Sequence, residues 1–159
     1  MSNARSSLAV LVFATFPLLL GLGVYALLKP EPSPEDQVRE AIQAVAQGAR
    51  DKNLGDAVKP ISRAYHDDEG LSFDNIRGVL FREFQQGQAI SVVLGPINVE
   101  LDPDGKTAWA DVDVALADGV DVSSLDFFPA NADALRFEVE LQKEGEDWKI
   151  ISQSHEPIR

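Results

Sequence analysis

The side chains that could carry out chemistry are few, and their spacing assembles no familiar catalytic set. A general acid or base needs an enclosed site that shifts its pKa. Tyr65 and His66 are the best polar candidates, and we expect Tyr65 as a buried ring with its hydroxyl at the cavity edge and His66 in solvent. Ser152 and Ser154 share one face of an expected strand, but two serines without a base are not a nucleophilic site. The sequence therefore predicts no catalytic residue.

Metal-binding patterns are equally sparse. His66 and His155 are isolated in the sequence and do not make a metal site. Residues 67–72 weakly resemble a calcium loop, but Tyr65 and Ile76 occupy its first and twelfth positions, where carboxylates are required. We therefore predict neither a metal ion nor a cofactor.

The elements that must position these residues begin with three helical segments. Ser33-Pro34 opens the first, over 35–50, with a capping hydroxyl and a proline in the first turn. Leu54, Val58, Ile61 and Tyr65 continue a helical spacing that Pro60 interrupts, which predicts two short helical pieces. Ser72 caps a third helix. Its apolar face comprises Phe73, Ile76, Leu80 and Phe84.

After Gly87 the apolar period changes from 3.6 to 2, which indicates strands. The alternation switches parity at Gly95-Pro96, as a bulge in a bent strand would produce. Turn sequences at 102–105 and 144–147 separate further strands. The expected inward rows contain no ionisable residue and comprise Ile90, Val92 and Leu94; Ala108, Ala110, Val112, Val114 and Leu116; Leu135, Phe137, Val139 and Leu141; and Trp148 and Ile150. This order predicts an α+β fold, with three helices packed on a curved four-stranded antiparallel sheet.

The order of elements resembles the nuclear transport factor two-like superfamily, also known as SnoaL-like or cystatin-like cone folds. The resemblance covers most of residues 35–156 and includes Ile61–Tyr65, Phe81–Phe84 and the final Gly145-Glu146-Asp147-Trp148-Lys149-Ile150. It implies a curved sheet around a helix, with a conical cavity between them. The family usually has a hairpin before the third helix, and here only Asp67–Leu71 is available for it. The superfamily contains both enzymes and non-enzymatic modules, so the resemblance does not fix a function.

An uncharged apolar run, Leu8–Leu28, precedes this domain. Its length suits a helix across a bilayer core of about 30 Å. Arg5 lies before it and every acidic residue after Pro30, so the positive-inside rule predicts a cytoplasmic stub over 1–7, a transmembrane helix over 8–28, a proline-rich spacer over 29–34 and an external domain over 35–159. The alternative is a secretory signal cleaved near Val24-Tyr25-Ala26. We expect a bacterial inner membrane, with the domain in the periplasm or outside the cell.

The net charge of the chain limits the classes of partner that it can bind. The chain has 26 acidic and 14 basic residues, for a net charge of −12. This argues against nucleic acid, which requires a basic face. Glu100, Asp111, Asp113, Glu138 and Glu140 are expected on the outward sheet face with Trp109. An outward tryptophan suggests a homodimer contact or an envelope protein partner. Phe127 and Phe128, within the long connection 118–133, are further interface candidates.

Two functions remain open at this point. The first is a single-pass envelope protein whose external domain binds or scaffolds without catalysis. The second is a small-ligand-binding protein or SnoaL-like enzyme, of the isomerase, dehydratase or hydrolase type. Its cone pocket would be lined by Tyr65, Phe84, Trp148 and Ser152.

Overall fold

The computed structural model describes residues 31–85, 90–118 and 133–158. The expected stub over 1–7, the membrane segment over 8–28, and Phe127 and Phe128 lie outside the described residues. Within the described part of the chain, no helix is long and apolar enough to cross a bilayer. The chain divides into Met1–Pro32 and Ser33–Arg159, and the described helices and strands belong to the second unit.

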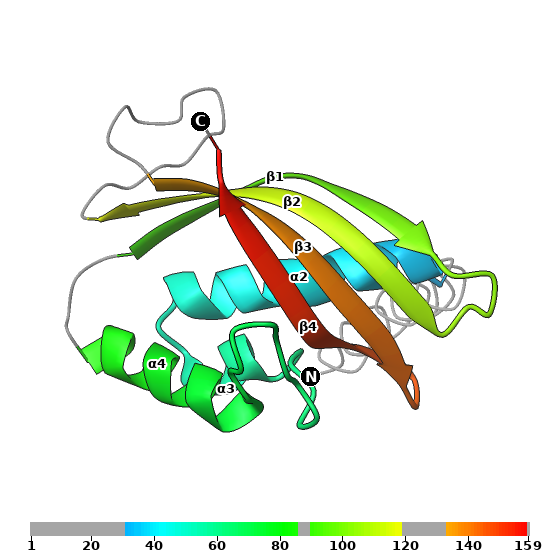
Figure 1. Ribbon diagram of the computed structural model, residues 1–159, viewed down its shortest axis with the longest axis horizontal. Helices are drawn as coiled ribbons and strands as arrows, with labels where there is room; N and C mark the ends of the chain where they lie inside the picture. The colour runs from blue at the N-terminus through cyan, green and yellow to red at the C-terminus, as the bar shows by residue number, and fades with distance from the viewer. Residues whose placement is uncertain (1–30, 86–89, 119–132, 159) are drawn as a thin grey trace, which may run out of the picture. The chain divides into compact units, whose positions relative to one another are not determined.

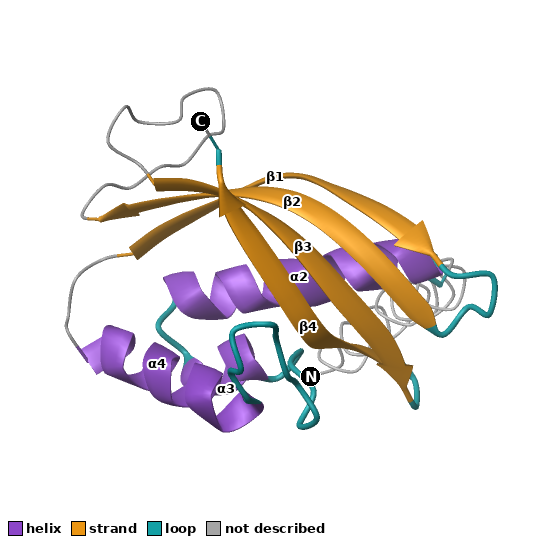
Figure 2. Cartoon of the chain, viewed as in Figure 1, coloured by secondary structure: helices purple, strands orange, loops and turns teal. Residues whose placement is uncertain are grey.

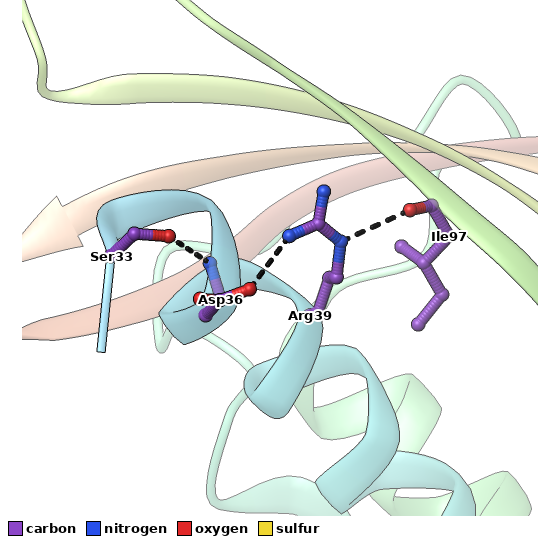
Figure 3. Close-up of polar contacts among 4 residues, drawn as sticks. All are labelled: Ser33, Asp36, Arg39 and Ile97. Atoms are coloured by element: carbon purple, nitrogen blue, oxygen red, sulfur yellow. Dashed lines mark hydrogen bonds and ion pairs between the residues drawn. The ribbon is translucent and has the colours of Figure 1, made fainter.

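Helix α2 (Pro34–Arg50) begins where its sequence predicts. The backbone N–H of Asp36 donates to the Ser33 hydroxyl at 3.1 Å, and Pro34 occupies the first turn. Arg39 pairs with Asp36 at 2.8 Å, and its Nε also donates to the carbonyl of Ile97 at 3.2 Å (Figure 3). The start of α2 is therefore tied to the first strand of the sheet.

The end of α2 is fixed by the short helix α3 (Leu54–Val58). A Cβ on Gly48 would lie 2.6 Å from the Cα of Ala57, so only glycine allows the two helices to approach this closely. Arg50, in the last turn of α2, donates to the carbonyl of Val92 at 2.7 Å. Together with the Arg39 contact, this bond attaches both ends of α2 to one strand.

In the described residues the sheet has four antiparallel strands, as predicted, and their order is β1-β2-β3-β4. Figures 1 and 2 show it arching over α2, with α3 and α4 (Phe73–Gln85) on the same side. The register of β1 on β2 shifts between Leu94 and Ile97, which confirms the bulge expected at Gly95-Pro96. The strands are β1 (Ile90–Leu101), β2 (Thr107–Asp118), β3 (Asp133–Glu144) and β4 (Asp147–Pro157).

Residues 60–66 correct the helical prediction for this segment. The spacing of Ile61 and Tyr65 suggested a helix, but the chain runs alongside β4 instead. Ile150 N–H donates to the carbonyl of Pro60 at 2.9 Å, and Ser62 N–H donates to the carbonyl of Ile150 at 2.9 Å. Pro60 cannot continue a helix, and the edge of β4 offers its backbone groups as partners. At the place of the hairpin that the resembled family usually has before its third helix, the chain forms a single β-bridge between His66 and Ser72.

The core lies between α2 and the inner face of the sheet. Val38, Ile42 and Ala46 supply the buried stripe of α2, and Tyr65 and Phe73 close one side. The strands contribute the alternate residues that the sequence predicts, as their side chains point to one face every second residue. The strand residues in the buried cluster are Val92, Ala108, Ala110, Val112, Val114, Val139, Leu141, Trp148 and Ile150.

Candidate functional site: an apolar cavity under the sheet

A cavity of about 290 Å³ lies between α2, α4 and the inner face of the sheet. Among the described residues, its walls are apolar at every position except Tyr65 and Gln153. Val79 on α4 lines the cavity and is also 39% exposed, so this part of the wall borders solvent. The apolar lining residues are Ile42, Val45, Ala46, Ala49, Ile61, Ile76, Val79, Leu80, Val92, Leu94, Val112, Val114, Phe137, Val139 and Ile150.

Small side chains on α2 help to leave this space open. Ala46 and Ala49 occur on the stripe where α2 faces the cavity, and neither side chain extends beyond its Cβ. Opposite them, α4 contributes Ile76 and Leu80, which are only half buried. Protein interiors normally fill such volumes with side chains, so an unfilled apolar space of this size can receive a ligand.

Tyr65 is the first polar group at the cavity wall, and it is paired with Asp67. The Tyr65 hydroxyl donates to Oδ2 of Asp67 at 2.9 Å, and Oδ1 accepts the N–H of Leu71 at 2.8 Å. Both side chains are buried, with 3% and 5% of their surfaces exposed. Asp67 therefore fixes the hydroxyl of Tyr65 and the turn that leads to α4.

The pKa values of Tyr65 and Asp67 are both shifted away from neutral pH. Burial and the hydrogen bond to Asp67 raise the pKa of the Tyr65 hydroxyl. Burial opposes ionisation of Asp67, but hydrogen bonds from the Leu71 N–H and the Tyr65 hydroxyl outweigh it and lower the pKa of this carboxyl. At neutral pH the tyrosine is a fixed neutral donor and the aspartate a fixed anion.

Gln153 is the second polar group, and a bulge places it at the cavity. Between Glu140 and Leu141 the pairing with β4 shifts by one residue, so that Leu141 faces Ile150 but Glu140 faces Ser152. The alternation of β4 therefore reverses after Ile150, and Gln153 lines the cavity with Val139. A glutamine amide offers both a donor and an acceptor.

The same bulge corrects two predicted orientations. Ser152 and Ser154 are opposite Glu140 and Glu138, on the outer face of the sheet, and are not among the cavity-lining residues. On the opposite face, His155 pairs with Phe137 and stacks on it with ring centroids 5.4 Å apart. The alternation in the sequence continues across the extra residue, so it gives no sign of the reversal.

The four residues expected to line a pocket are placed differently from one another. Tyr65 is at the cavity wall. Phe84 is half buried near the end of α4 and is not among the lining residues. Trp148 is 4% exposed and packs in the core, where its Nε1 has no hydrogen-bond partner within the part of the chain that the structure describes. Ser152 lies on the outer face for the reason given above.

Sequence reasoning missed Asp67 and Gln153. The helical spacing predicted for Ile61 and Tyr65 gives no reason to pair Tyr65 with Asp67, because residues two apart in a helix do not face each other. In an extended segment, residues two apart share a face, so Tyr65-x-Asp67 would have brought the two side chains together. Gln153 had no comparable signal, because its orientation depends on the bulge.

The outer face of the sheet, opposite to α2, is polar and carries Trp109, which is 46% exposed. The guanidinium of Arg136 donates to both carboxylate oxygens of Asp113, at 2.8 and 3.2 Å, and lowers the pKa of that carboxyl. Among the described residues, no group of three or more His, Asp or Glu side chains is placed to hold a metal ion. Other polar residues on this face include Glu100, Asp111, Glu138, Glu140, Ser152 and Ser154.

No protein-family model and no curated protein matches the sequence. Solved structures do match the fold. An NTF2-like protein of unknown function from Pseudomonas putida KT2440 aligns with a TM-score of 0.60 and 16% identity, over 76% of this chain and 84% of that one. A Novosphingobium aromaticivorans protein, provisionally assigned as a scytalone dehydratase, aligns with a TM-score of 0.64 and 8% identity, over 79% and 84%.

A third match is Bd1075 from Bdellovibrio bacteriovorus, with a TM-score of 0.62 and 10% identity. The alignment covers 79% of this chain but only 40% of Bd1075. At identities this low, the matches establish the fold alone. The chain thus has the α+β fold of NTF2-like and cystatin-like proteins, as the order of its elements suggested.

Proposed function

We propose that Ser33–Arg159 is a non-catalytic binding domain, which holds a small, uncharged and largely apolar molecule in the cavity. The apolar lining carries this proposal, because the described residues contribute polar groups to it only at Tyr65 and Gln153. An apolar cavity of about 150 Å³ can take up benzene, and this one measures about 290 Å³. The cavity therefore suits a ligand somewhat larger than benzene, with a neutral polar group placed against the amide of Gln153.

The lining also disfavours a charged ligand. Among the described residues, no acidic or basic side chain lines the cavity. A carboxylate or ammonium entering it would lose its hydration without gaining an ionic partner, which costs several kcal/mol in proteins. Neutral ligands avoid this cost.

The electrostatics of Tyr65 and Asp67 support binding over catalysis. General acid–base catalysis works best when the pKa of the catalytic group lies near the operating pH. The pKa of Tyr65 is raised and that of Asp67 is lowered, so both move away from neutrality. The hydroxyl proton is also already donated to Asp67.

The competing proposal is a SnoaL-like enzyme that uses Tyr65. It is favoured by the position of Tyr65 at the cavity wall. The two proposals differ in the effect of Tyr65→Phe. An enzyme would bind its substrate but lose turnover, whereas a binding domain would keep its ligand with little change in affinity.

In our proposal the domain lies outside the cytoplasmic membrane of a bacterium. Its support is the uncharged segment Leu8–Leu28 and the concentration of every acidic residue after Pro30. Protease treatment of intact spheroplasts tests this placement. Digestion of the domain with the N-terminus protected agrees with it, and full protection until lysis contradicts it.

A matched pair of α2 variants tests the cavity. Ala49→Phe places a ring in the cavity, whereas Ala44→Phe places the same ring on the exposed side of the same helix. Native mass spectrometry of residues 31–159, with naphthalene-sized neutral compounds, should show binding to wild type and Ala44→Phe and none to Ala49→Phe. Equal binding by the two variants would exclude this cavity as the binding site.

A further inference from the structure

Trp109 is exposed on the outer face of the sheet and does not line the cavity. Trp109 lies on the inner strand β2, directly between Glu100 of β1 and Glu140 of β3 in the register. Side chains directly opposite each other on antiparallel strands have Cβ atoms about 5 Å apart. The indole therefore has a carboxylate on each side.

The neighbouring row of the sheet extends this negative surface. Asp111 is two residues beyond Trp109 on the same face, and it pairs in register with Glu138. A hollow of about 320 Å³ is lined by Trp109 together with Asp68, Asp111, Glu138 and Glu140. The hollow thus combines one large aromatic surface with several anions.

Basic side chains on this face do not neutralise the hollow. The guanidinium of Arg136 is engaged by both carboxylate oxygens of Asp113, in the row beyond Asp111. Lys149 donates to the carbonyl of Lys59 and pairs with Asp147 at 3.4 Å, near the start of β4. Among the described residues that line the hollow, none is basic.

We propose that the outer face, centred on Trp109, is a docking surface for an arginine-bearing basic segment of a partner protein. A guanidinium stacks on the face of tryptophan and, in the same plane, donates to carboxylates beside it. Glu100 and Glu140 flank Trp109 on the two neighbouring strands, where their carboxylates can receive such donors. A lysine ammonium would gain the charge attraction but would not stack in the same way.

Charge complementarity also decides against a second copy of this chain, which the exposed tryptophan alone suggested. A two-fold dimer interface brings the same patch of both subunits together. On this face that would bring Glu100, Asp111, Glu138 and Glu140 against one another, and like charges across an interface cost several kcal/mol. A basic segment removes that repulsion.

The test uses full-length protein in a non-ionic detergent, with Trp148→Phe as the background, so that Trp109 is the sole tryptophan. A hexa-arginine peptide at low ionic strength should change the fluorescence of Trp109 and saturate. Hexa-lysine should bind more weakly. Added salt should weaken both, because the ion pairs are exposed.

Matched charge variants distinguish binding at a defined site from attraction to the net negative charge of the protein. Glu100→Gln with Glu140→Gln should weaken hexa-arginine binding by about five- to tenfold, since two exposed ion pairs are lost. Glu40→Gln with Glu146→Gln removes the same charge at exposed positions elsewhere, and should leave the affinity nearly unchanged.

Equal weakening by both pairs of substitutions would overturn the proposal, since the peptide would then be sensing only net charge. Sedimentation of the same protein gives a second decision. A dimer that Trp109→Arg converts to monomer would assign the face to self-association and refute the basic partner. The basic partner is supported by two results together: a species whose size is unaffected by Trp109→Arg, and a loss of hexa-arginine affinity that is specific to the variant of Glu100 and Glu140.

Discussion

Removing the carboxylate of Asp67 should destabilise the protein far more than removing any of its acidic neighbours. Asp67 is 5% exposed and accepts hydrogen bonds from the Tyr65 hydroxyl and the Leu71 N–H. In Asp67→Ala these two donors lose their acceptor, and an orphaned buried donor costs about 1–3 kcal/mol. We therefore expect a loss of about 2–4 kcal/mol in the free energy of unfolding. Asp68→Ala, at an exposed site, should cost less than about 0.5 kcal/mol.

The effect should also depend on pH in a defined direction. The pKa of Asp67 in the folded protein lies below its ordinary value of 3.8. The unfolded chain therefore binds the proton more readily, and the stabilisation is fully present above the unfolded pKa of about 4. It is lost as the pH falls through the folded pKa. Asp67→Asn keeps the shape of the side chain but has no such dependence.

Urea denaturation of wild type, Asp67→Asn and Asp68→Asn between pH 7 and pH 2.5 measures how the stabilisation by Asp67 depends on pH. Wild type should exceed Asp67→Asn by about 1–2 kcal/mol at pH 7, because hydrogen bonds to a charged acceptor are stronger than those to a neutral one. The gap should narrow below pH 4. A gap that stays constant with pH, or one that Asp68→Asn reproduces, would refute the role given to the Asp67 carboxylate.

Two further substitutions test the packing. Gly48→Ala should lower the free energy of unfolding by about 1–3 kcal/mol, because the new Cβ would meet the backbone of Ala57 and α3 would have to move. Unchanged thermal unfolding would contradict the close approach of α2 and α3. Trp148→Phe should cost less than about 1.5 kcal/mol despite its burial, since it removes a buried N–H that has no partner among the described residues. A loss of 3 kcal/mol or more would contradict this expectation.

The sequence predicts most of the fold because its signals are local. Ser33 and Pro34 mark the start of α2, and Gly95-Pro96 marks the bulge in β1, where a Cβ would lie 3.2 Å from the carbonyl oxygen of Asp113. The inward rows follow from alternation alone. Each of these features depends on residues that are adjacent or nearly adjacent in the chain.

The site is less predictable because it depends on contacts between distant segments. The bulge in the pairing of β3 with β4 turns Ser152 outward and Gln153 inward, and no residue type at this point announces it. The helical spacing of Ile61 and Tyr65 is overridden by backbone bonds to Ile150, 89 residues away from Ile61 in the numbering. The volume of the cavity depends on how α4 lies against α2, which sequence periodicity does not specify.

Methyl NMR of the protein with a bound neutral probe tests the cavity most directly. With naphthalene added to residues 31–159, nuclear Overhauser contacts should link the probe to the methyl groups of Ile42, Val112 and Val139, which line the inner wall. Phe81 of α4, which does not line the cavity, and Trp109 on the outer face of the sheet should show none. Contacts confined to the neighbourhood of Phe81 or Trp109, with no response from the three inner methyl groups, would contradict a ligand site under the sheet.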